Sequence, residues 1–324
     1  MRIALLTTEY PPFYGGVATW SGGVARALAE AGHELRVFTH LGGGATGAAA
    51  ADVSAAVPVT RLHGRSWNRW GHLWTAAQVR PRLRPGELVL AATWPLAAAL
   101  VGAAPLAVAW HGSDLTRAPV IAGRGFVAAA AVNLPVSRFL GGVLGAAHTV
   151  LPYPIRPVRP ARRGEKLLVI ARLNAQKGVD RAVRLASRLG RPLDVVGDGP
   201  ERPRLEALAA ELGVAATFRG FTRDIPWEGA WAVVLLSRPY PDGSGAEGLG
   251  LVLLEAAARG VPSIGSRVGG IPEAASVVLD DPEDDPVPEL PDVDAVQGWL
   301  AANHGPERCV AAFEGAVAAG FGAG

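Results

Sequence analysis

The chain has 324 residues, of which 49% are apolar and 19% are charged, and its formal net charge is +2. A chain of this length usually forms two domains, and so large an apolar fraction excludes global disorder. The single cysteine, Cys309, excludes a disulfide framework and a cysteine-built metal site. The charge is too small, and too evenly spread, to indicate a nucleic-acid partner.

Strands are expected to alternate with helices in the first half. A helix from about Ala18 to Ala31 is predicted, ended by Gly32. The expected strands are the short apolar runs at 3–7, 34–39, 88–92, 106–110 and 131–135. This order predicts a parallel sheet covered by helices. The N-terminal apolar run is too short for a signal peptide, so a cytoplasmic protein is expected.

Residues 88–110 carry no charge and are long enough to span a bilayer. Pro95, Gly102 and Pro105 interrupt the run, and buried parallel strands also read as continuous apolar stretches. We therefore expect a strand, a short helix at 95–101 and a second strand here, rather than a membrane span.

A boundary between two domains is expected at residues 151–166, which hold four prolines and five basic residues. The resulting prediction is a first Rossmann-like domain at 1–155, a second at 156–290, and a helical tail at 291–324 that packs on the first. Strands of the second domain are expected at 167–170, 193–196, 217–219, 231–236 and 263–265. Its helices are expected at 179–189, 201–212, 249–259 and 272–275, with tail helices at 293–302 and 307–319.

Open parallel sheets bind ligands at the carboxyl ends of their strands, and two candidate loops of the first domain lie there. Gly15 and Gly16 precede the first helix, where a phosphate can approach the backbone. His111 follows a strand and can donate to a ligand oxygen. The local alternative, a turn with Asp114 as helix N-cap, is favoured by the residues alone.

Two further loops belong to the second domain. Arg172 and Lys177 share a loop after its first strand; they can neutralise a diphosphate or form surface ion pairs, and the loop alone does not separate the two. Glu247 precedes a helix and Glu255 lies eight residues later, at most about 12 Å along the helix axis. Carboxylates so placed can accept hydrogen bonds from two sets of sugar hydroxyls.

Several other chemistries lack their motifs. The sequence has no dinucleotide fingerprint, no nucleophile elbow and no phosphate-binding loop of the Gly-x-x-x-x-Gly-Lys type. The seven histidines form no metal-spaced pair. Asp292 and Asp294 have the spacing of a metal clamp but lie in the tail. Neither a metal nor a cofactor is therefore expected.

The order of these loops strongly resembles glycosyltransferase family 4, a retaining family that uses nucleotide sugars and has the GT-B fold of two Rossmann-like domains facing a cleft. The matching segments are Gly15–Ala18, His111–Asp114, Arg172–Gly178, Gly197–Pro200, Glu247–Ala256 and Gly269–Glu273. The most specific of them pairs Glu247 and Glu255 with Arg172 and Lys177.

The resemblance implies roles for individual residues. Arg172 and Lys177 would hold the donor diphosphate, Glu247 the donor sugar and Glu255 the ribose, while His111 would face the transferred sugar. The residues implied to line the rest of the donor site are Gly15, Gly16, Gly197, Arg219, Gly220, Phe221, Gly248, Leu249 and Gly250.

The chain departs from the family pattern at Ala171, where a glycine is usual, and at Tyr153-Pro154, which replaces Asn-Gly. An unusual aromatic segment at 67–74 either covers the edge of the core, which is slightly favoured, or lines the acceptor site. In the second case Trp67, Arg69 and Trp70 would contact the acceptor.

The loops, together with the resemblance, thus imply a bacterial, retaining, metal-independent glycosyltransferase that moves a hexose from a UDP- or GDP-sugar to an acceptor hydroxyl on a natural product, lipid or glycan. The sequence is compatible with peripheral membrane contact, and a monomer or weak dimer is expected. The alternatives are a nucleotide-sugar epimerase or hydrolase of the same fold, and a silent sugar-nucleotide-binding subunit.

Overall fold

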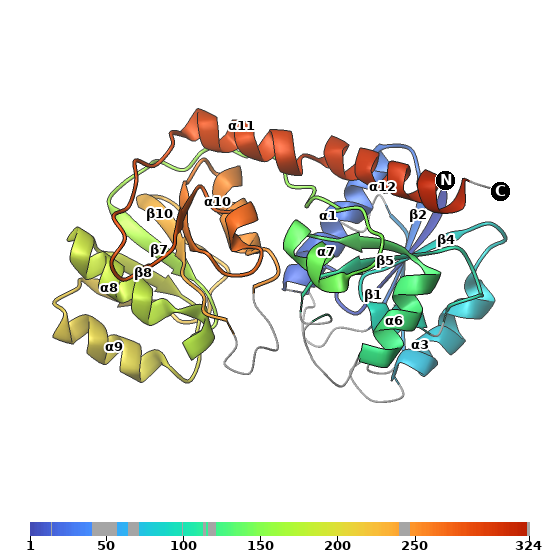
Figure 1. Ribbon diagram of the computed structural model, residues 1–324, viewed down its shortest axis with the longest axis horizontal. Helices are drawn as coiled ribbons and strands as arrows, with labels where there is room; N and C mark the ends of the chain where they lie inside the picture. Colours follow the sequence, from blue (N-terminus) through green and yellow to red (C-terminus); the bar gives the residue numbers. More distant parts are fainter. Residues whose placement is uncertain are drawn as a thin grey trace. The chain divides into compact units, whose positions relative to one another are not determined.

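A computed structural model describes residues 1–13, 15–40, 57–63, 71–98, 100–112, 115, 121–239 and 247–322. The chain forms two compact units (Figure 1). Unit 1 comprises Met1–Pro154 and His304–Gly324, and unit 2 comprises Ile155–Asn303. The predicted tail is thus divided between them, because its last helix belongs to unit 1 and the helix before it to unit 2.

Unit 1 contains a six-stranded parallel sheet in the order β3-β2-β1-β4-β5-β6. Its strands are β1 (Arg2–Thr7), β2 (Glu34–His40), β3 (Val59–Leu62), β4 (Leu88–Ala91), β5 (Leu106–Trp110) and β6 (Val132–Pro135). Its helices are α1 (Gly16–Glu30), α3 (Gly71–Val79), η1 (Arg80–Arg82), α4 (Trp94–Ala98), α6 (Ile121–Ala130), α7 (Arg138–Leu144) and α12 (Pro306–Phe321). The sheet order reverses between β1 and β4, which creates a ligand-binding position at their carboxyl ends.

The uncharged run at 88–110 forms β4, α4 and β5, as predicted. Both strands are fully buried, and Leu90 pairs in register with Ala107. No helix in the described part of the chain is long and apolar enough to cross a membrane.

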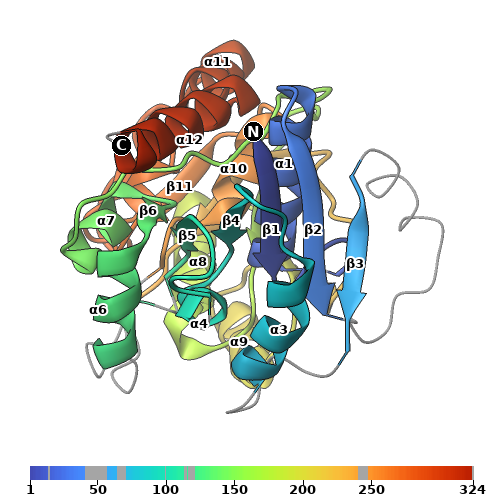
Figure 2. The ribbon, with the colours of Figure 1, turned by 90° about the vertical axis from the view of Figure 1, so that its right-hand side faces the viewer.

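The C-terminal helix α12 packs against α1 within unit 1 (Figure 2). Phe313 of α12 is fully buried and meets the His33 ring edge-on, with ring centroids 6.5 Å apart. Nε2 of His33 lies 3.1 Å from the carboxylate of Glu314, the next residue of α12. Cys309 is also buried on this helix, and burial raises the pKa of its thiol to about 12.

Unit 2 contains a second parallel sheet in the order β12-β11-β10-β7-β8-β9. Its strands are β7 (Lys166–Ile170), β8 (Leu193–Val196), β9 (Ala216–Phe218), β10 (Ala230–Leu235), β11 (Ser263–Ser266) and β12 (Val277–Leu279). Its helices are η3 (Ala175–Lys177), α8 (Val179–Leu189), α9 (Arg202–Glu211), α10 (Leu251–Ala258), η4 (Ile271–Glu273) and α11 (Val293–His304), whose last residue falls in unit 1. Here the order reverses between β7 and β10.

Apolar spacing explains why α8 lies on this sheet. Val179, Ala182, Val183 and Ala186 recur at helical intervals and are buried in a core that also holds Val195 of β8. Glycines at both ends take the left-handed conformation, so the helix begins and ends where the sequence predicts. The predicted α/β fold of two Rossmann-like units is confirmed.

Candidate active site

The site in unit 2 forms where the loops after β7 and β10 meet at the carboxyl edge of the sheet. Gly178 has a φ of +62°, and a Cβ there would lie 1.9 Å from the carbonyl oxygen of Leu236. The Arg238 amide donates to the carbonyl oxygen of Gln176 at 2.8 Å. The two loops are therefore joined directly, and glycine is the residue that their close approach requires.

Lys177 and Glu247 come together at this junction. The Lys177 ammonium lies 2.5 Å from a carboxylate oxygen of Glu247, and the side chains are 28% and 21% exposed. The side chain of Asn174 accepts a hydrogen bond from the Lys177 amide at 3.1 Å and so caps η3. A cation and a carboxylate are thus held in one partly buried position that solvent, or a ligand, can still reach.

The backbone around Glu247 is fixed by the loop after β11. The Gly270 amide donates to the carbonyl oxygen of Glu247 at 2.8 Å. Gly248 and Leu249 are buried, and Gly250 caps α10 with a φ of +86°. Because Gly250 is left-handed, α10 begins at Leu251 rather than at 249 as predicted. Its first amides form a helix N-terminus of the kind that favours an anion.

Glu255 lies in the second turn of α10 and is half-buried. Burial raises the pKa of its carboxyl, and the Arg259 charge opposes this effect more weakly. The Arg259 guanidinium donates to the carbonyl oxygen of Glu255 at 3.0 Å. Among the described residues, no side chain pairs with the carboxylate itself, so it can receive hydroxyl groups.

Arg172 is exposed at the start of the β7 loop. Its neighbour Leu173 is fully buried and anchors the loop. Within the described part of the chain, no acidic side chain forms an ion pair with Arg172, in contrast to Lys177. The alternative of a surface ion pair therefore describes Lys177 better than Arg172.

Gly197 lies on the neighbouring loop after β8. It has a φ of +128°, and a Cβ on it would lie 1.9 Å from the carbonyl oxygen of Ala171. A Cβ on Gly199 would lie 2.3 Å from that of Leu173. Close packing of the β7 and β8 loops accounts for both glycines.

The Arg219 side chain is 38% exposed and pairs with Asp194. That carboxylate is 5% exposed and lies 2.9 Å from both Arg219 and Lys166. The next residues behave differently. The Gly220 carbonyl accepts a hydrogen bond from the Gly197 amide at 2.8 Å. Phe221 is 74% exposed, more than any other large apolar side chain among the described residues.

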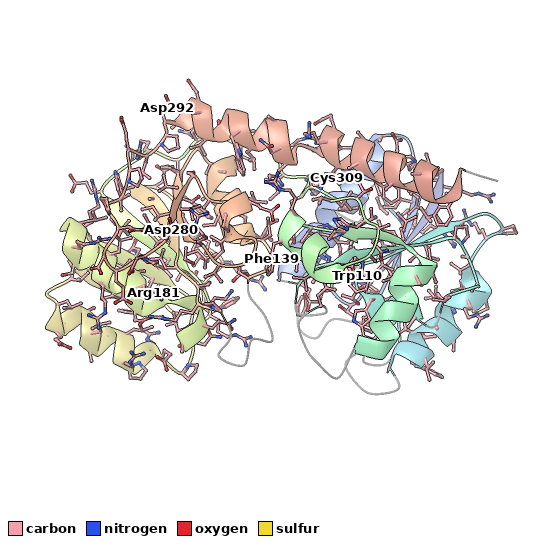
Figure 3. The ribbon with its side chains drawn as sticks, in the orientation of Figure 1. Trp110, Phe139, Arg181, Asp280, Asp292 and Cys309 are labelled. Carbon is pink, nitrogen blue, oxygen red and sulfur yellow. The ribbon has the colours of Figure 1, made fainter. Side chains whose placement is uncertain are left out.

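Three of the predicted site residues that the structure describes belong to unit 1. His111 follows the buried Trp110, whose indole donates to Asn133 at 3.1 Å; Figure 3 labels Trp110 in this unit. The His111 ring meets Trp20 edge-on at 4.7 Å, and burial lowers its pKa to about 3, so the imidazole is neutral at pH 7. Gly15 caps α1, and the Gly16 carbonyl accepts from Tyr153 at 3.1 Å.

The predicted acceptor residues Trp67, Arg69 and Trp70 lie outside the described residues, as does Asp114. The last part of the aromatic segment lies on α3. There Leu73 and Trp74 are each 56% exposed, whereas Thr75 and Ala76 are buried.

Some residues of the site region were missed from the sequence. Arg238 binds Asp180 of α8 with both guanidinium nitrogens, at 2.7 and 2.9 Å. Burial alone would raise the pKa of Asp180, but its bonds to Arg238 outweigh that effect and the pKa is lowered. This pair fixes the start of the segment that leads to Glu247. Glu9 of unit 1 was also missed, although it stands two residues after the end of the buried strand β1.

No group of three or more acidic, histidine or cysteine side chains in the described residues is placed to hold a metal ion. The Asp292–Asp294 spacing has a structural explanation, because the Asp292 carboxylate accepts from the Ala295 amide at 2.8 Å and caps α11. Figure 3 labels Asp292 at the start of that helix.

Comparisons with known proteins indicate the class of this chain, a glycosyltransferase with the GT-B fold. Residues 155–276, most of unit 2, match the model of the family described as glycosyl transferases group 1. The matched segment contains Lys177, Glu247 and Glu255.

Whole-chain similarities agree with this class. A GDP-mannose-dependent alpha-(1-6)-phosphatidylinositol monomannoside mannosyltransferase of Mycobacterium tuberculosis is 29% identical over 319 residues, which cover 84% of this chain and 82% of the relative. The crystal structure of AviGT4, a glycosyltransferase involved in avilamycin A biosynthesis, has a TM-score of 0.71 and 22% identity, with 98% of both chains covered. A structure of Anabaena Alr3699/HepE in complex with UDP also has a TM-score of 0.71, at 16% identity, with 98% of this chain and 100% of that chain covered.

Proposed function

We propose that this chain is a retaining glycosyltransferase that moves a hexose from a nucleoside diphosphate sugar to an acceptor hydroxyl, by a front-face mechanism and without a metal ion. The observation that carries the proposal is the contact of Lys177 with Glu247, in the matched segment and at the point where the order of the sheet reverses. Open α/β sheets bind their ligands at this position.

Sugar transfer breaks the bond between the anomeric carbon and the phosphate and leaves negative charge on the diphosphate. Fixed cations and helix N-termini can stabilise that charge. Arg172 is exposed and lacks an ionic partner among the described residues, so it can bind a phosphate without losing a contact. Lys177 would exchange Glu247 for a phosphate oxygen, next to the first amides of α10.

The carboxylates of Glu247 and Glu255 would then bind the hydroxyl groups of the two sugars of the donor, the hexose and the ribose. Once Lys177 turns to the phosphate, Glu247 can accept from hydroxyls of the donor hexose. Glu255 lies further along α10, and its unpaired carboxylate suits the ribose hydroxyls. The exposed ring of Phe221 offers a surface for the nucleobase, while Gly197, Gly220, Gly248, Leu249 and Gly250 provide the backbone around the donor.

The reaction needs a base for the acceptor hydroxyl, and we propose that the leaving phosphate takes this proton on the face from which it departs. A double displacement would need a carboxylate close beneath the anomeric carbon. We assign no residue to that role. In unit 1, the neutral His111 would contribute a hydrogen bond to the transferred sugar, and Trp67, Arg69 and Trp70 would contact the acceptor.

The donor is proposed from the names of similar proteins. The Mycobacterium tuberculosis relative is GDP-mannose-dependent, and the Anabaena protein was crystallised with UDP. GDP-mannose and UDP-glucose are therefore the first donors to test.

The test is release of nucleoside diphosphate from each donor, with and without a polyol acceptor, followed by NMR of the product. A product that keeps the anomeric configuration of the donor supports the proposal. An inverted product would overturn the retaining mechanism. An epimerised donor, hydrolysis that ignores every acceptor, or binding without turnover would instead establish one of the alternative functions.

A further inference from the structure

Glu9 lies at the carboxyl end of β1, beside the point where the order of the unit 1 sheet reverses. Its backbone is fixed by two hydrogen bonds to the Thr7 hydroxyl. The hydroxyl donates to the Glu9 carbonyl oxygen at 2.8 Å, and the Glu9 amide donates to the hydroxyl oxygen at 3.3 Å. The same hydroxyl lies 2.9 Å from that of Ser21 on α1, and both residues are fully buried. Strand, turn and helix therefore hold Glu9 in one place.

The Glu9 carboxylate lies against Gly15, the residue that caps α1. A Cβ on Gly15 would lie 2.7 Å from Oε2 of Glu9, so the glycine leaves the space that the carboxylate occupies. The first turn of α1 contains no acidic residue of its own. Glu9 is thus the carboxylate at this helix end among the described residues.

The surroundings of Glu9 differ from those of a structural carboxylate. The carboxylate of the buried Glu87 in the same unit accepts two hydrogen bonds from the Arg36 guanidinium, at 3.0 and 2.5 Å. It also accepts one from the Arg84 amide at 2.9 Å. Glu9 is half-buried, and burial raises its pKa. No cation or hydrogen-bond donor of the described residues meets its carboxylate. An unpaired, partly desolvated carboxylate at a ligand-binding edge is typical of a functional site.

We infer that Glu9 binds the acceptor, and that the acceptor presents two neighbouring hydroxyls of a polyol or sugar to it. The inference rests on the proposed glycosyltransferase function. An ionised carboxylate offers two oxygens as acceptors and no donor, so it suits paired hydroxyls and repels an anion. A diphosphate at this helix end would first have to displace Glu9. We therefore assign Gly15 and Gly16 to the acceptor site, although the resemblance implies that they line the donor site.

The test compares Glu9→Gln, Glu9→Asp and Gly15→Ala with wild type, using GDP-mannose or UDP-glucose as donor and myo-inositol or methyl α-mannoside as acceptor. Glu30→Gln, at the exposed far end of α1, is the control. Acceptor KM is measured by turnover, polyol binding by saturation-transfer NMR, and the Kd of the nucleoside diphosphate by calorimetry.

We expect Glu9→Gln to raise the acceptor KM about ten- to a hundred-fold, as loss of a hydrogen bond to a charged group does. The Kd of the nucleoside diphosphate and the melting temperature should stay at wild-type values. Gly15→Ala should also weaken acceptor binding, because its methyl group displaces the Glu9 carboxylate. Glu9→Asp should retain part of the acceptor binding, because it keeps a carboxylate.

Three results would overturn the inference. One is an unchanged acceptor KM and polyol signal in Glu9→Gln. Another is tighter binding of the nucleoside diphosphate by that variant, which would mean that the carboxylate competes with an anion for α1. The third is that neither polyol binds the wild-type protein. Failure of the proposed function looks different, since wild type would then release nucleotide from no sugar nucleotide at all.

Discussion

The guanidinium of Arg219 lies 2.9 Å from the carboxylate of Asp194, a residue in the middle of an apolar strand that is almost completely buried. Lys166 shares the same carboxylate oxygen at 2.9 Å. The resemblance implies a donor-binding role for Arg219, yet this contact gives it a structural one. The pair also places Gly220 and Phe221 at the end of β9, so the two roles can be separated by experiment.

Arg219→Ala is expected to destabilise unit 2 because Asp194 loses one of its two cations. Loss of a hydrogen bond to a charged group costs about 1.5–3 kcal/mol. Phe221→Ala should instead weaken nucleotide binding with little change in stability, since its ring is 74% exposed. Urea unfolding and calorimetric titration with GDP and UDP measure the two effects. An Arg219→Ala protein as stable as wild type would contradict the structural role.

Lys177→Ala should lower kcat by several hundred-fold if the ammonium stabilises the leaving diphosphate, because one such group contributes about 3–4 kcal/mol in the transition state. The fold should survive, since the contact with Glu247 is partly exposed. Arg204→Ala is the matched control, as Arg204 forms an exposed ion pair with Glu201 on the same unit. Equal loss of activity in both variants would remove the special role of Lys177.

Arg172→Ala should lower kcat/KM for the donor and leave the melting temperature unchanged. The side chain is exposed and forms no ion pair within the described residues, so its removal breaks no contact that stabilises the fold. Thermal denaturation and steady-state kinetics on one preparation give both numbers. A clear drop in melting temperature would mean that Arg172 has a structural partner.

Turnover should persist in excess EDTA if, as proposed, Arg172, Lys177 and the N-terminus of α10 supply the positive charge at the leaving group. The measurement is nucleotide release before and after chelation, with manganese added back. Loss of turnover that manganese restores would contradict the proposal and indicate a carboxylate-bound ion.

Acid should destabilise unit 1 through His111. The pKa of this histidine is about 3 in the folded state, against 6.5 for an exposed histidine, so the unfolded chain binds the extra proton first. Its contribution to stability is complete above pH 6.5 and falls by about 1.4 kcal/mol per pH unit as the pH drops toward 3. His304, with a pKa of about 4, acts in the same direction.

His111→Asn should flatten this part of the stability curve, measured by urea unfolding at pH values from 4 to 7. An identical slope in the variant and in wild type would show that the imidazole is not desolvated in solution.

Much of the fold could be predicted because its strands are continuous apolar runs and its helices have clear ends. Strand β8 and helix α8 match their predicted bounds, and α8 combines an amphipathic pattern with a glycine at each end. Strand β3 and helix α7 were missed. The first is only partly buried, and the second is short and rich in glycine, so neither has a clear period.

The site was predictable in its parts but not in its pairings. Glycine-flanked loops at strand ends indicate Lys177 and Glu247 separately, yet their contact joins residues 70 positions apart, and only the order of the strands brings them together. Glu9 carries no motif at all. What sets it apart is the space left by Gly15, which depends on backbone positions that periodicity does not encode.

Helix α12 is synthesised after the whole of unit 2, although it completes unit 1, whose other elements precede unit 2 in the chain. Until residues 306–321 emerge, α1 lacks the helix that packs against it, and His33 lacks its contacts with Phe313 and Glu314. Unit 2 is by then entirely translated. The nascent first unit therefore stays unfinished throughout elongation of the second, and a ribosome that stalls late yields a protein with its second sheet complete and the surface of α1 uncovered.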